Sequence, residues 1–474
     1  MQYSVVNYKM VKENSDFRID ADYFRLDFLN SLKLITSHEN LMLSEISNVN
    51  GGKRLPLGEN FSDSDNGVSY IRAEDVKNGF VQYENSPKIS LKLHEFLKRY
   101  QTKKEDILIT IVGNSIGDVG IVKFDLKKCN LTENCAKVTN LEKVIPEFLF
   151  TFLLSKHGQI QIHREKVGTA QPKLALERIR KFKIPIFSAK FQNNFSIIVN
   201  QANQFIDNSK SLYSQAEQLL LSELGLSDWK PKHELSFVKN FSETQKAERM
   251  DAEYFQPFYE EVESKLSMFE QKTLDELCSE INYGTVPTSP YVEVGIPYIK
   301  GLNLIEGLIG GKIDRIKNTD SLSQKYYTKE NDIVISQMGT VGKAGLVSKK
   351  EEGCLFASFT IRVRLAGYDF VDPYILTLFI NKIARPYYLM RKIAQASVRQ
   401  NTDLPTIKSL RVPKLGDKIQ QTIRDNIIES RELKHLSKSL LEIAKQGVEM
   451  AIEKDEKEAE NWINGEIEKF DISI

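Results

Sequence analysis

Residues 106–122, DILITIVGNSIGDVGIV, recur as DIVISQMGTVGKAGLV at residues 332–347 with one deletion. Further segments recur in the same order on either side of this pair. RIDADYF at 18–24 recurs as RMDAEYF at 249–255, a shift of 231 residues. Because the order and the spacing are kept, the chain is one repeat of about 230 residues written twice.

Each repeat divides into a mixed part and a helical part. The mixed part joins short β-rich runs by glycine and proline, and it contains one helical stretch. The glycines in the quoted segments predict a tight turn between two strands. The last ~35 residues of each repeat instead space their apolar residues alternately by three and four, which is the pattern of a coiled coil. The tetrapeptide SKSL stands inside both helical parts, at 209–212 and at 437–440.

The two helical stripes predict how the repeats combine. One amphipathic stripe is ordinarily buried on its own globule, but two long stripes at equal spacing are best buried on one another. We therefore expect an α+β protein with two tandem globules, each followed by a long helix. The two helices should pair as an antiparallel coiled coil with pseudo-two-fold symmetry. The expected seam residues are Phe205, Leu212, Leu219, Leu433, Leu440 and Ile443.

Composition excludes several classes of protein. The chain has 474 residues, of which 41% are hydrophobic and 27% are charged, as in ordinary globular proteins rather than disordered or collagen-like ones. The four cysteines form no C-x-x-C pair, so we expect reduced, buried thiols and no metal site. No apolar run approaches the ~18 residues needed to cross a bilayer, and the first residues do not resemble a signal peptide. We expect a cytoplasmic protein with no membrane partner.

Charge is balanced over the whole chain but not along it. There are 65 lysines and arginines against 64 aspartates and glutamates. Residues 160–190 carry a local net charge of +6 and residues 382–414 one of +7, whereas residues 449–474 carry −6. Basic clusters either contact phosphates or lie on solvated helix faces. Two clusters at matching places of a repeat favour two contacts with one nucleic-acid duplex, at a spacing set by helix length.

Signatures of catalysis are missing from the sequence. No two glycines are separated by a single residue, so there is no G-x-G dinucleotide or methyl-donor loop. GTVGKAG at 339–345 lacks the first glycine and the Ser or Thr of a phosphate-binding loop. There is no [DN]-P-P-[YF] segment and no H-E-x-x-H segment. We therefore expect a chain that catalyses no reaction and binds no cofactor or metal itself.

Several segments resemble a known family. These are LTENCAKV at 131–138, VGNSIGDVGIV at 112–122, GTAQPKL at 168–174 and IPIF at 184–187 followed by a helix. Together with the doubled RIDADYF and RMDAEYF, they resemble the DNA-specificity subunit of Type I restriction-modification systems over nearly the whole chain. The second copy departs from the pattern, because SVRQNTDLPTI at 397–407 stands where the first copy has GTAQPKLALERI.

The resemblance implies a fold and a set of partners. Each globule would be a target-recognition domain that reads one half of a two-part site in double-stranded DNA. The helices would set the spacing and dock methyltransferase and restriction-translocase subunits. S-adenosylmethionine, ATP and Mg would be bound by those partners. The implied divisions are recognition domains at 1–187 and 227–415, spacer helices at 188–226 and 416–456, and an acidic tail at 457–474.

Candidate DNA-reading residues are polar or basic side chains on loops, where they can reach base edges. In the first domain they are Lys53, Arg54, Arg72, Asn114, Ser115, Gln171 and Lys173. In the second domain they are Tyr283, Lys300, Gln337, Thr340, Lys343, Arg399 and Gln400. Two other interpretations remain open: a coiled-coil scaffold that binds proteins and not DNA, and a fused enzyme that modifies DNA unaided.

Overall fold

The strands of the quoted segments pair with each other in each half of the chain, as β6 and β7 in the first half and as β18 and β19 in the second. This computed structural model describes residues 5–12, 17–62, 66–77, 79–124, 129–168, 172–287, 290–317, 322–393 and 401–470. The chain divides into two compact units. Unit 1 is Met1–Asn208 with Leu433–Ile474, and unit 2 is Ser209–Glu432.

Unit 1 contains three small sheets. The largest has the order β2 (Asn48–Gly51), β9 (Cys135–Thr139), β6 (Ile107–Thr110), β7 (Val119–Ile121) and β4 (Gly79–Phe80). A second sheet has the order β5 (Lys88–Ile89), β3 (Val68–Ile71) and β8 (Cys129–Leu131). The third pairs β1 (Asn40–Met42) with β10 (Lys183–Pro185). The helices before α8 are α1 (Tyr8–Lys12), α2 (Leu26–Ser37), α3 (Leu43–Ile46), α4 (Leu91–Phe96), α5 (Pro146–Leu154), α6 (Lys156–Glu165) and α7 (Leu176–Ile179).

Unit 2 repeats this topology with one extra strand in each of its two larger sheets. Its largest sheet has the order β12 (Cys278–Tyr283), β21 (Thr360–Leu365), β18 (Ile333–Ser336), β19 (Ala344–Leu346), β16 (Leu308–Ile309) and β15 (Leu304–Ile305). The others are β13 (Tyr291–Val292), β17 (Asp314–Ile316), β14 (Ile296–Ile299) and β20 (Leu355–Phe356), and the pair β11 (Gln271–Thr273) and β22 (Arg411–Pro413). Its short helices are α9 (Phe241–Ala247), α10 (Pro257–Leu266), α11 (Leu274–Leu277), α12 (Pro373–Phe379), α13 (Met390–Lys392) and α14 (Leu404–Lys408).

The central strand of each large sheet explains why the quoted segment decides the fold. In β6 all four residues are buried, and the same holds for β18. Strands buried on both faces read as continuous apolar runs, as DILITI and DIVIS do. The turns that follow contain Gly113 and Gly117 in the first copy, and Gly339 and Gly342 in the second, all with positive φ. The predicted glycine turn between two strands is therefore present in both copies.

The repeated RIDADYF and RMDAEYF segments act as clamps. Arg18 pairs with Asp20 at 2.7 Å and donates to the main-chain oxygens of Arg164 and Lys166 at the end of α6. Arg164 in return donates to the Tyr23 carbonyl at 3.0 Å, and its guanidinium lies 3.7 Å from the centre of the Tyr23 ring.

The same clamp occurs in unit 2. Arg249 pairs with Asp251 at 2.7 Å and donates to the Arg391 and Ile393 carbonyls. Arg391 donates to the Tyr254 carbonyl at 2.9 Å. Since an arginine fork can satisfy several acceptors and stack on a ring at once, the recurrence of this motif has a structural cause.

Two long helices are shared between the units. The helix α8 (Ala189–Glu223) is divided after Asn208, and α15 (Asp417–Glu453) is divided after Glu432. In unit 1, Ser437 donates to the Ala202 carbonyl at 2.7 Å. In unit 2, Ser209 and Ser430 each donate to the other's carbonyl at 2.7 Å. Along α8, Ala202 comes before Ser209, whereas along α15 the partner of Ala202, Ser437, comes after the partner of Ser209, Ser430. The two helices therefore run antiparallel.

The seam between the two long helices contains smaller side chains than the sequence suggests. Of the expected residues, Leu440 and Ile443 are buried, Phe205 and Leu219 pack against the cores, and Leu212 and Leu433 are half-buried. Buried small residues also occupy it at spacings of seven: Ala202, Ser209 and Ala216 on α8, and Ser430, Ser437 and Ala444 on α15. Small side chains allow close approach of helices, and the serine hydroxyls are satisfied by carbonyls. The α+β class with a long helix after each globule is confirmed.

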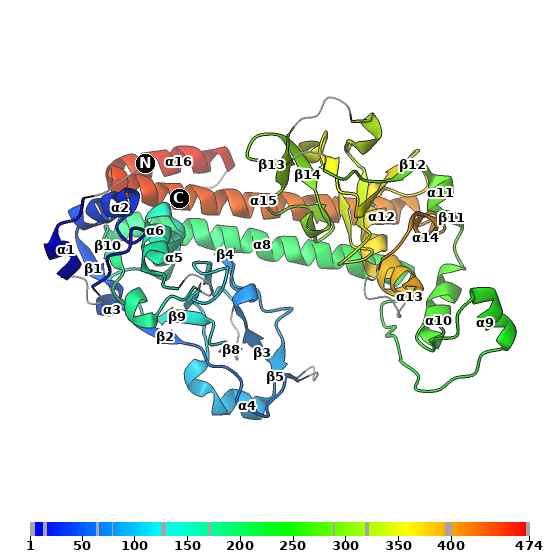
Figure 1. The fold of residues 1–474 in the computed structure, drawn as a ribbon, viewed down its shortest axis with the longest axis horizontal. Coiled ribbons are helices and arrows are strands. Elements are labelled where there is room, and N and C mark those ends of the chain that lie inside the picture. The colour runs from blue at the N-terminus through cyan, green and yellow to red at the C-terminus, as the bar shows by residue number, and fades with distance from the viewer. Residues whose placement is uncertain are drawn as a thin grey trace. The chain divides into compact units, whose positions relative to one another are not determined.

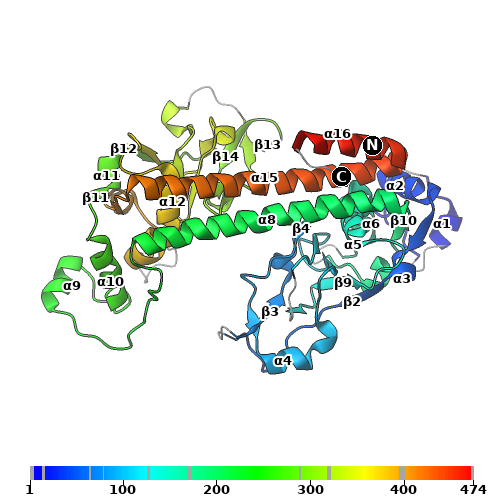
Figure 2. The ribbon, with the colours of Figure 1, turned by 180° about the vertical axis from the view of Figure 1, so that it is seen from behind.

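The C-terminal segment is not the acidic tail that the sequence suggests. Residues 456–467 form α16 (Glu456–Ile467), with Ala459, Ile463 and Ile467 buried in the core of unit 1. In both views α16 lies beside the end of α15 (Figures 1 and 2). The many acidic residues obscured the apolar spacing of four, which is typical of a helix packed on one face. None of the helices in the described ranges could span a membrane.

Leu440 offers a test of this core. Replacing it by aspartate places a carboxylate among apolar side chains, so we expect the free energy of unfolding to fall by about 4 kcal/mol or more. Leu433→Asp is the control, because Leu433 is half-buried and its carboxylate can reach water. Urea denaturation followed by circular dichroism measures both losses. Equal losses would contradict the place of Leu440 in the core.

Candidate nucleic-acid interface

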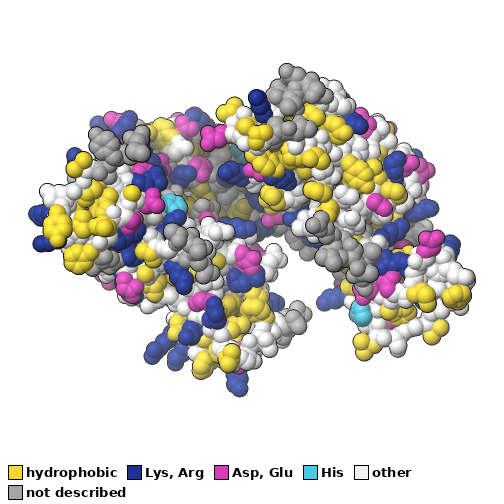
Figure 3. Space-filling model, viewed as in Figure 1, with side chains coloured by type: hydrophobic (Ala, Val, Ile, Leu, Met, Phe, Trp, Pro, Cys, Tyr) yellow, Lys and Arg dark blue, Asp and Glu magenta, His cyan; other side chains and the backbone are white. Residues whose placement is uncertain are grey.

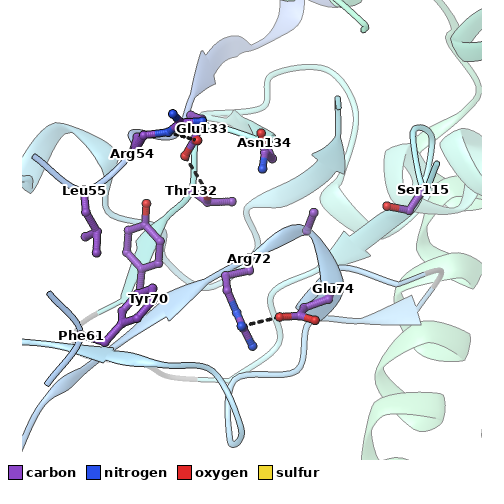
Figure 4. A pocket seen from close by; sticks show the side chains of 11 residues that line it. Arg54, Leu55, Phe61, Tyr70, Arg72, Glu74, Ser115, Thr132, Glu133 and Asn134 are labelled. Atoms are coloured by element: carbon purple, nitrogen blue, oxygen red, sulfur yellow. Dashed lines mark hydrogen bonds and ion pairs between the residues drawn. The ribbon is translucent and has the colours of Figure 1, made fainter. Parts of the chain in front are cut away.

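An open pocket of about 520 Å³ lies in unit 1, at the ends of β2, β3 and β8 and beside the turn after β6 (Figure 4). It brings together three of the residues expected to read DNA, namely Arg54, Arg72 and Ser115. The other lining residues are Leu55, Phe61, Tyr70, Ala73, Glu74, Thr132, Glu133 and Asn134. The three come from separate loops, so the fold rather than sequence proximity assembles the pocket.

A close backbone crossing holds one wall of the pocket in place. A Cβ atom at Gly52 would lie 2.0 Å from the Thr132 carbonyl oxygen, so only glycine fits there. Directly after it, the Lys53 amide donates to the Leu131 carbonyl at 2.9 Å. The Tyr70 hydroxyl donates to the Lys53 carbonyl at 2.5 Å. These contacts fix the loop that carries Arg54 against the loop that follows β8.

Each arginine of the pocket is held by an acid. The Arg54 guanidinium lies 2.6 Å from the Glu133 carboxylate, and Arg72 pairs with Glu74 (Figure 4). Burial by itself raises the pKa of Glu133, but hydrogen bonds from Arg54 and Thr132 outweigh it and hold that pKa below its usual value. Arg54 is 80% exposed, so its charge stays accessible to a ligand. An arginine held in one orientation by a carboxylate can present its remaining donors to two acceptors in a plane.

The remaining candidates of the first copy lie nearby or outside the pocket. Lys53 is exposed, and Asn114 is exposed in the glycine turn next to Ser115. Lys173 is also exposed, and its main chain pairs with Val167. Gln171 lies outside the described residues.

In the second copy, Lys300 is the candidate with a defined environment. Its ammonium lies 2.5 Å from the Asp314 carboxylate and 4.2 Å from the centre of the Tyr291 ring. The hydrogen bond to Asp314 raises the pKa of Lys300. Lys300 follows β14 as Arg72 follows β3, and both residues precede a short helical turn.

The other candidates of the second copy are less uniform. Thr340 is exposed, and Lys343 is half-buried. Gln337 is bound through its main chain to Phe359 and Thr402. The Tyr283 hydroxyl accepts from the Leu404 amide at 3.1 Å, which ties it to the interior of unit 2. Arg399 and Gln400 lie outside the described residues.

The two basic clusters serve the fold more than the sequence suggests. Besides the clamp arginines Arg164 and Arg391, Arg178 pairs with Glu165 at 3.0 Å. Lys382 pairs with Glu217 at 2.6 Å. The charge count in these segments therefore overstates the number of cations available to phosphates, because ion pairs and carbonyls within the units already bind several of them.

Exposed cations gather instead on a segment that the charge count did not single out. Figure 3 shows dark blue side chains over the part of unit 1 that contains α4. The exposed basic residues here are Lys92, Lys98, Arg99, Lys103 and Lys104. The inner face of this segment, Leu93 and Leu97, packs in one cluster with Tyr70 of the pocket wall. Cations of this kind beside a reading pocket are suited to phosphates.

The lining residues that sequence reasoning missed are Leu55, Phe61, Tyr70, Ala73, Glu74, Thr132, Glu133 and Asn134. Apolar and acidic residues are not favoured by a search for base-reading side chains. A signal was present, however, because TEN at 132–134 directly follows β8 and precedes Cys135 within the repeated region. The segment ASF at 357–359 occupies the same place in the second copy.

Comparison with known proteins identifies the fold around this pocket. Residues 38–218 match the model of the Type I restriction modification DNA specificity domain. This segment is therefore similar to a Type I DNA specificity domain. The family resemblance predicted from the sequence is confirmed, and the pocket lies within the specificity domain.

Named relatives agree with this assignment. The specificity subunit of the Type I restriction enzyme EcoBI from Escherichia coli is 26% identical over 221 residues, which are 46% of this chain and 44% of that protein. The MjaVIII specificity subunit from Methanocaldococcus jannaschii is 25% identical over 156 residues, 31% of this chain and 35% of that protein. The chain thus spans less than half the length of either relative.

A solved structure covers more of the chain at a lower similarity. The Type I restriction-modification S subunit from M. genitalium aligns with 86% of this chain and 94% of its own, at 15% identity and a TM-score of 0.41.

The ion pair in the pocket of the specificity domain can be tested by titration. Arg54→Ala removes the ion pair that lowers the pKa of Glu133 and leaves the effect of burial and the Thr132 hydrogen bond, so we expect this pKa to rise. In the wild type, the pair stabilises the fold above the usual carboxyl pKa, and this contribution is lost as the pH falls through the lowered pKa. NMR titration of the labelled Glu133 carboxyl measures the shift. Lys53→Ala is the control, and an unchanged Glu133 pKa in Arg54→Ala would show that the pair does not form.

Proposed function

We propose that this chain is the DNA-binding specificity subunit of a Type I restriction-modification complex and that it reads a two-part site. The specificity domain at residues 38–218 carries the proposal. The strand order of unit 2 repeats that of unit 1, which supports a second reading domain in the second copy. Each copy would read one half of the site. Because the two copies differ in sequence, the two half-sites need not be alike.

The reading surface of the first half is proposed to be the pocket around Arg54 and Arg72. Phosphate contacts position a protein on a duplex, and base-edge contacts give specificity. The exposed cations at Lys92, Lys98 and Arg99 would neutralise phosphates, while the acid-held arginines would reach base edges. In the second half, Lys300 takes the place of Arg72. The recognition domains would be residues 1–187 and 227–415.

Catalysis is assigned to partner subunits. Methyltransferase subunits would bind S-adenosylmethionine, and a restriction-translocase subunit would use ATP and Mg. The long helices, which the sequence places at 188–226 and 416–456, would separate the two reading surfaces and dock these partners. The complex would act in the cytoplasm. This chain would itself catalyse no step.

The proposal is tested by mapping DNA methylation genome-wide in the native strain, with and without the gene for this chain. We expect deletion to remove methylation at one asymmetric motif with two parts separated by a fixed gap. Complementation with the wild-type gene should restore it. A map unchanged by deletion, in a strain whose partner subunits are expressed, would contradict the proposal and favour a protein-binding scaffold.

Single substitutions separate base contacts from phosphate contacts. If Arg72 reads a base, Arg72→Ala should cost ~1–3 kcal/mol of binding free energy at one position of the first half-site. Lys300→Ala should act in the same way on the second half-site. Binding measured on a set of single-base variants of the site gives both values. A uniform loss over all variants would assign the residue to a phosphate instead.

A further inference from the structure

The main-chain hydrogen bonds of the two copies set up a residue-by-residue correspondence around the pocket. The Thr132 amide donates to the Ile71 carbonyl at 2.9 Å, and the Ala357 amide donates to the Ile299 carbonyl at 2.9 Å. The Ile111 amide donates to the Asn134 carbonyl at 2.9 Å, and the Gln337 amide donates to the Phe359 carbonyl at 2.9 Å. The loop after β8 therefore matches the loop after β20, so that Asn134 corresponds to Phe359.

The other two walls correspond in the same way. The Tyr70 hydroxyl donates to the Lys53 carbonyl, and the Tyr298 hydroxyl donates to the Thr285 carbonyl at 2.6 Å. Hence Arg54, the next residue, corresponds to Val286.

After β3 and β14, the Arg72 amide donates to the Asp75 side chain at 2.8 Å, and the Lys300 amide donates to the Asn303 side chain at 2.9 Å. Hence Glu74, which lies between Arg72 and Asp75, corresponds to Leu302.

The hydrogen bonds that hold these loops are thus the same in both copies, but the side chains that project from the loops differ in kind. Where unit 1 has Arg54, Glu74 and Asn134, unit 2 has Val286, Leu302 and Phe359. These three are 64%, 67% and 60% exposed. Thr132 is likewise replaced by Ala357. The cation of Arg72 is kept, because Lys300 corresponds to it, and Tyr70 is kept as Tyr298.

Such exposure has a meaning when it is grouped. Single exposed apolar residues are ordinary, whereas a group on adjoining loops marks a contact surface. The loops that carry Val286 and Phe359 adjoin, since the Ser358 amide donates to the Thr285 carbonyl at 2.9 Å. Lys300, at the position that corresponds to Arg72, pairs with Asp314 at 2.5 Å. Figure 3 shows hydrophobic side chains gathered over the part of unit 2 that contains β13 and β14.

We propose that the second copy reads thymines, through contact of Val286, Leu302 and Phe359 with their C5-methyl groups in the major groove, whereas the first copy reads hydrogen-bonding base edges through Arg54 and Arg72. This inference rests on the proposed function. Apolar side chains distinguish thymine by its methyl group, and arginine distinguishes guanine by its two acceptors. The two half-sites therefore differ in chemical class: the half read by unit 2 contains thymines whose methyl groups contribute to affinity.

The test uses the full-length chain, purified from the native strain with its partner subunits through a tag on this chain. A random duplex pool selected on this complex gives the bound site. The site is then resynthesised with deoxyuridine for thymidine, first in one half and then in the other. Because deoxyuridine lacks only the methyl group, base pairing and charge are unchanged.

We expect deoxyuridine in the half-site read by unit 2 to weaken binding about fourfold for each contacted methyl group. In Phe359→Ala, Leu302→Ala or Val286→Ala, part of this sensitivity should be lost, because the substituted residue no longer meets a methyl group. Met268→Ala is the matched control, since Met268 is 75% exposed in unit 2 and lies away from these loops in sequence. It should keep the full sensitivity.

Two binding results would overturn the inference and leave the proposed function intact, and a third result concerns the partner subunits. One is equal affinity for the thymidine and deoxyuridine duplexes in both halves. The other is an unchanged sensitivity in all three variants. Release of a partner subunit by Phe359→Ala, with DNA binding retained, would also overturn it, because the surface would then face a protein. Failure of the complex to select any sequence would contradict the proposed function itself.

Discussion

Neither long helix can bury its apolar stripe alone, and the fold depends on this constraint. The core of each compact unit includes a segment of a long helix, and in unit 1 this segment comes from beyond unit 2 in the sequence. Unit 1 takes residues 433–474, which supply Leu440, Ala444, Val448 and Ile463 to its core. Unit 2 takes residues 209–223, which supply Ala216 and Leu220. Each core therefore lacks part of its apolar surface without its helix segment.

A frame fixed in this way leaves its loops free to differ. The positions that hold the loops are kept in both copies. Gly52 and Gly284 each lie so close to a facing carbonyl that no side chain fits. Tyr70 and Tyr298 each donate a hydrogen bond to the carbonyl of the residue that follows this glycine. The positions that project from this frame are not kept. A repeat with a constant frame and variable projecting residues is well suited to recognising two different targets with one architecture, which is how a scaffold supports changes of specificity.

Much of the architecture was legible in the sequence because repetition is visible without coordinates. The buried strands 107–110 and 333–336, the glycine turns and the period of the long helices all follow from local pattern. What pattern could not show is how a charge is used. Arg164 and Arg391 count as cations in the sequence, but the structure binds them to carbonyls and tyrosine rings. Lys137 and Arg362 are buried in matching strands. Lys137 donates to the Gln101 carbonyl, and Arg362 donates to the Tyr327 carbonyl and to the side chains of Glu280 and Asn282.

Three of the eleven residues that line the pocket were expected from the sequence. Arg54, Arg72 and Ser115 are the residue types that read bases, and each was found by type and by its loop. Glu133 and Asn134 matter through the crossing that places them beside Arg54, and a crossing depends on long-range contacts that no local pattern contains.

We propose that both copies face DNA with matching loops, which carry Arg72 in unit 1 and Lys300 in unit 2. Site-specific photo-crosslinking tests it directly, with a benzophenone amino acid placed at position 72 or position 300 of the full-length chain in its native complex. We expect each position to crosslink to the target duplex, position 72 within one half-site and position 300 within the other. A probe at Thr36, which is exposed on α2, should give no DNA adduct. The proposal would be contradicted by crosslinks from positions 72 and 300 to partner proteins alone. It would also be contradicted by a crosslink to DNA from only one of the two positions.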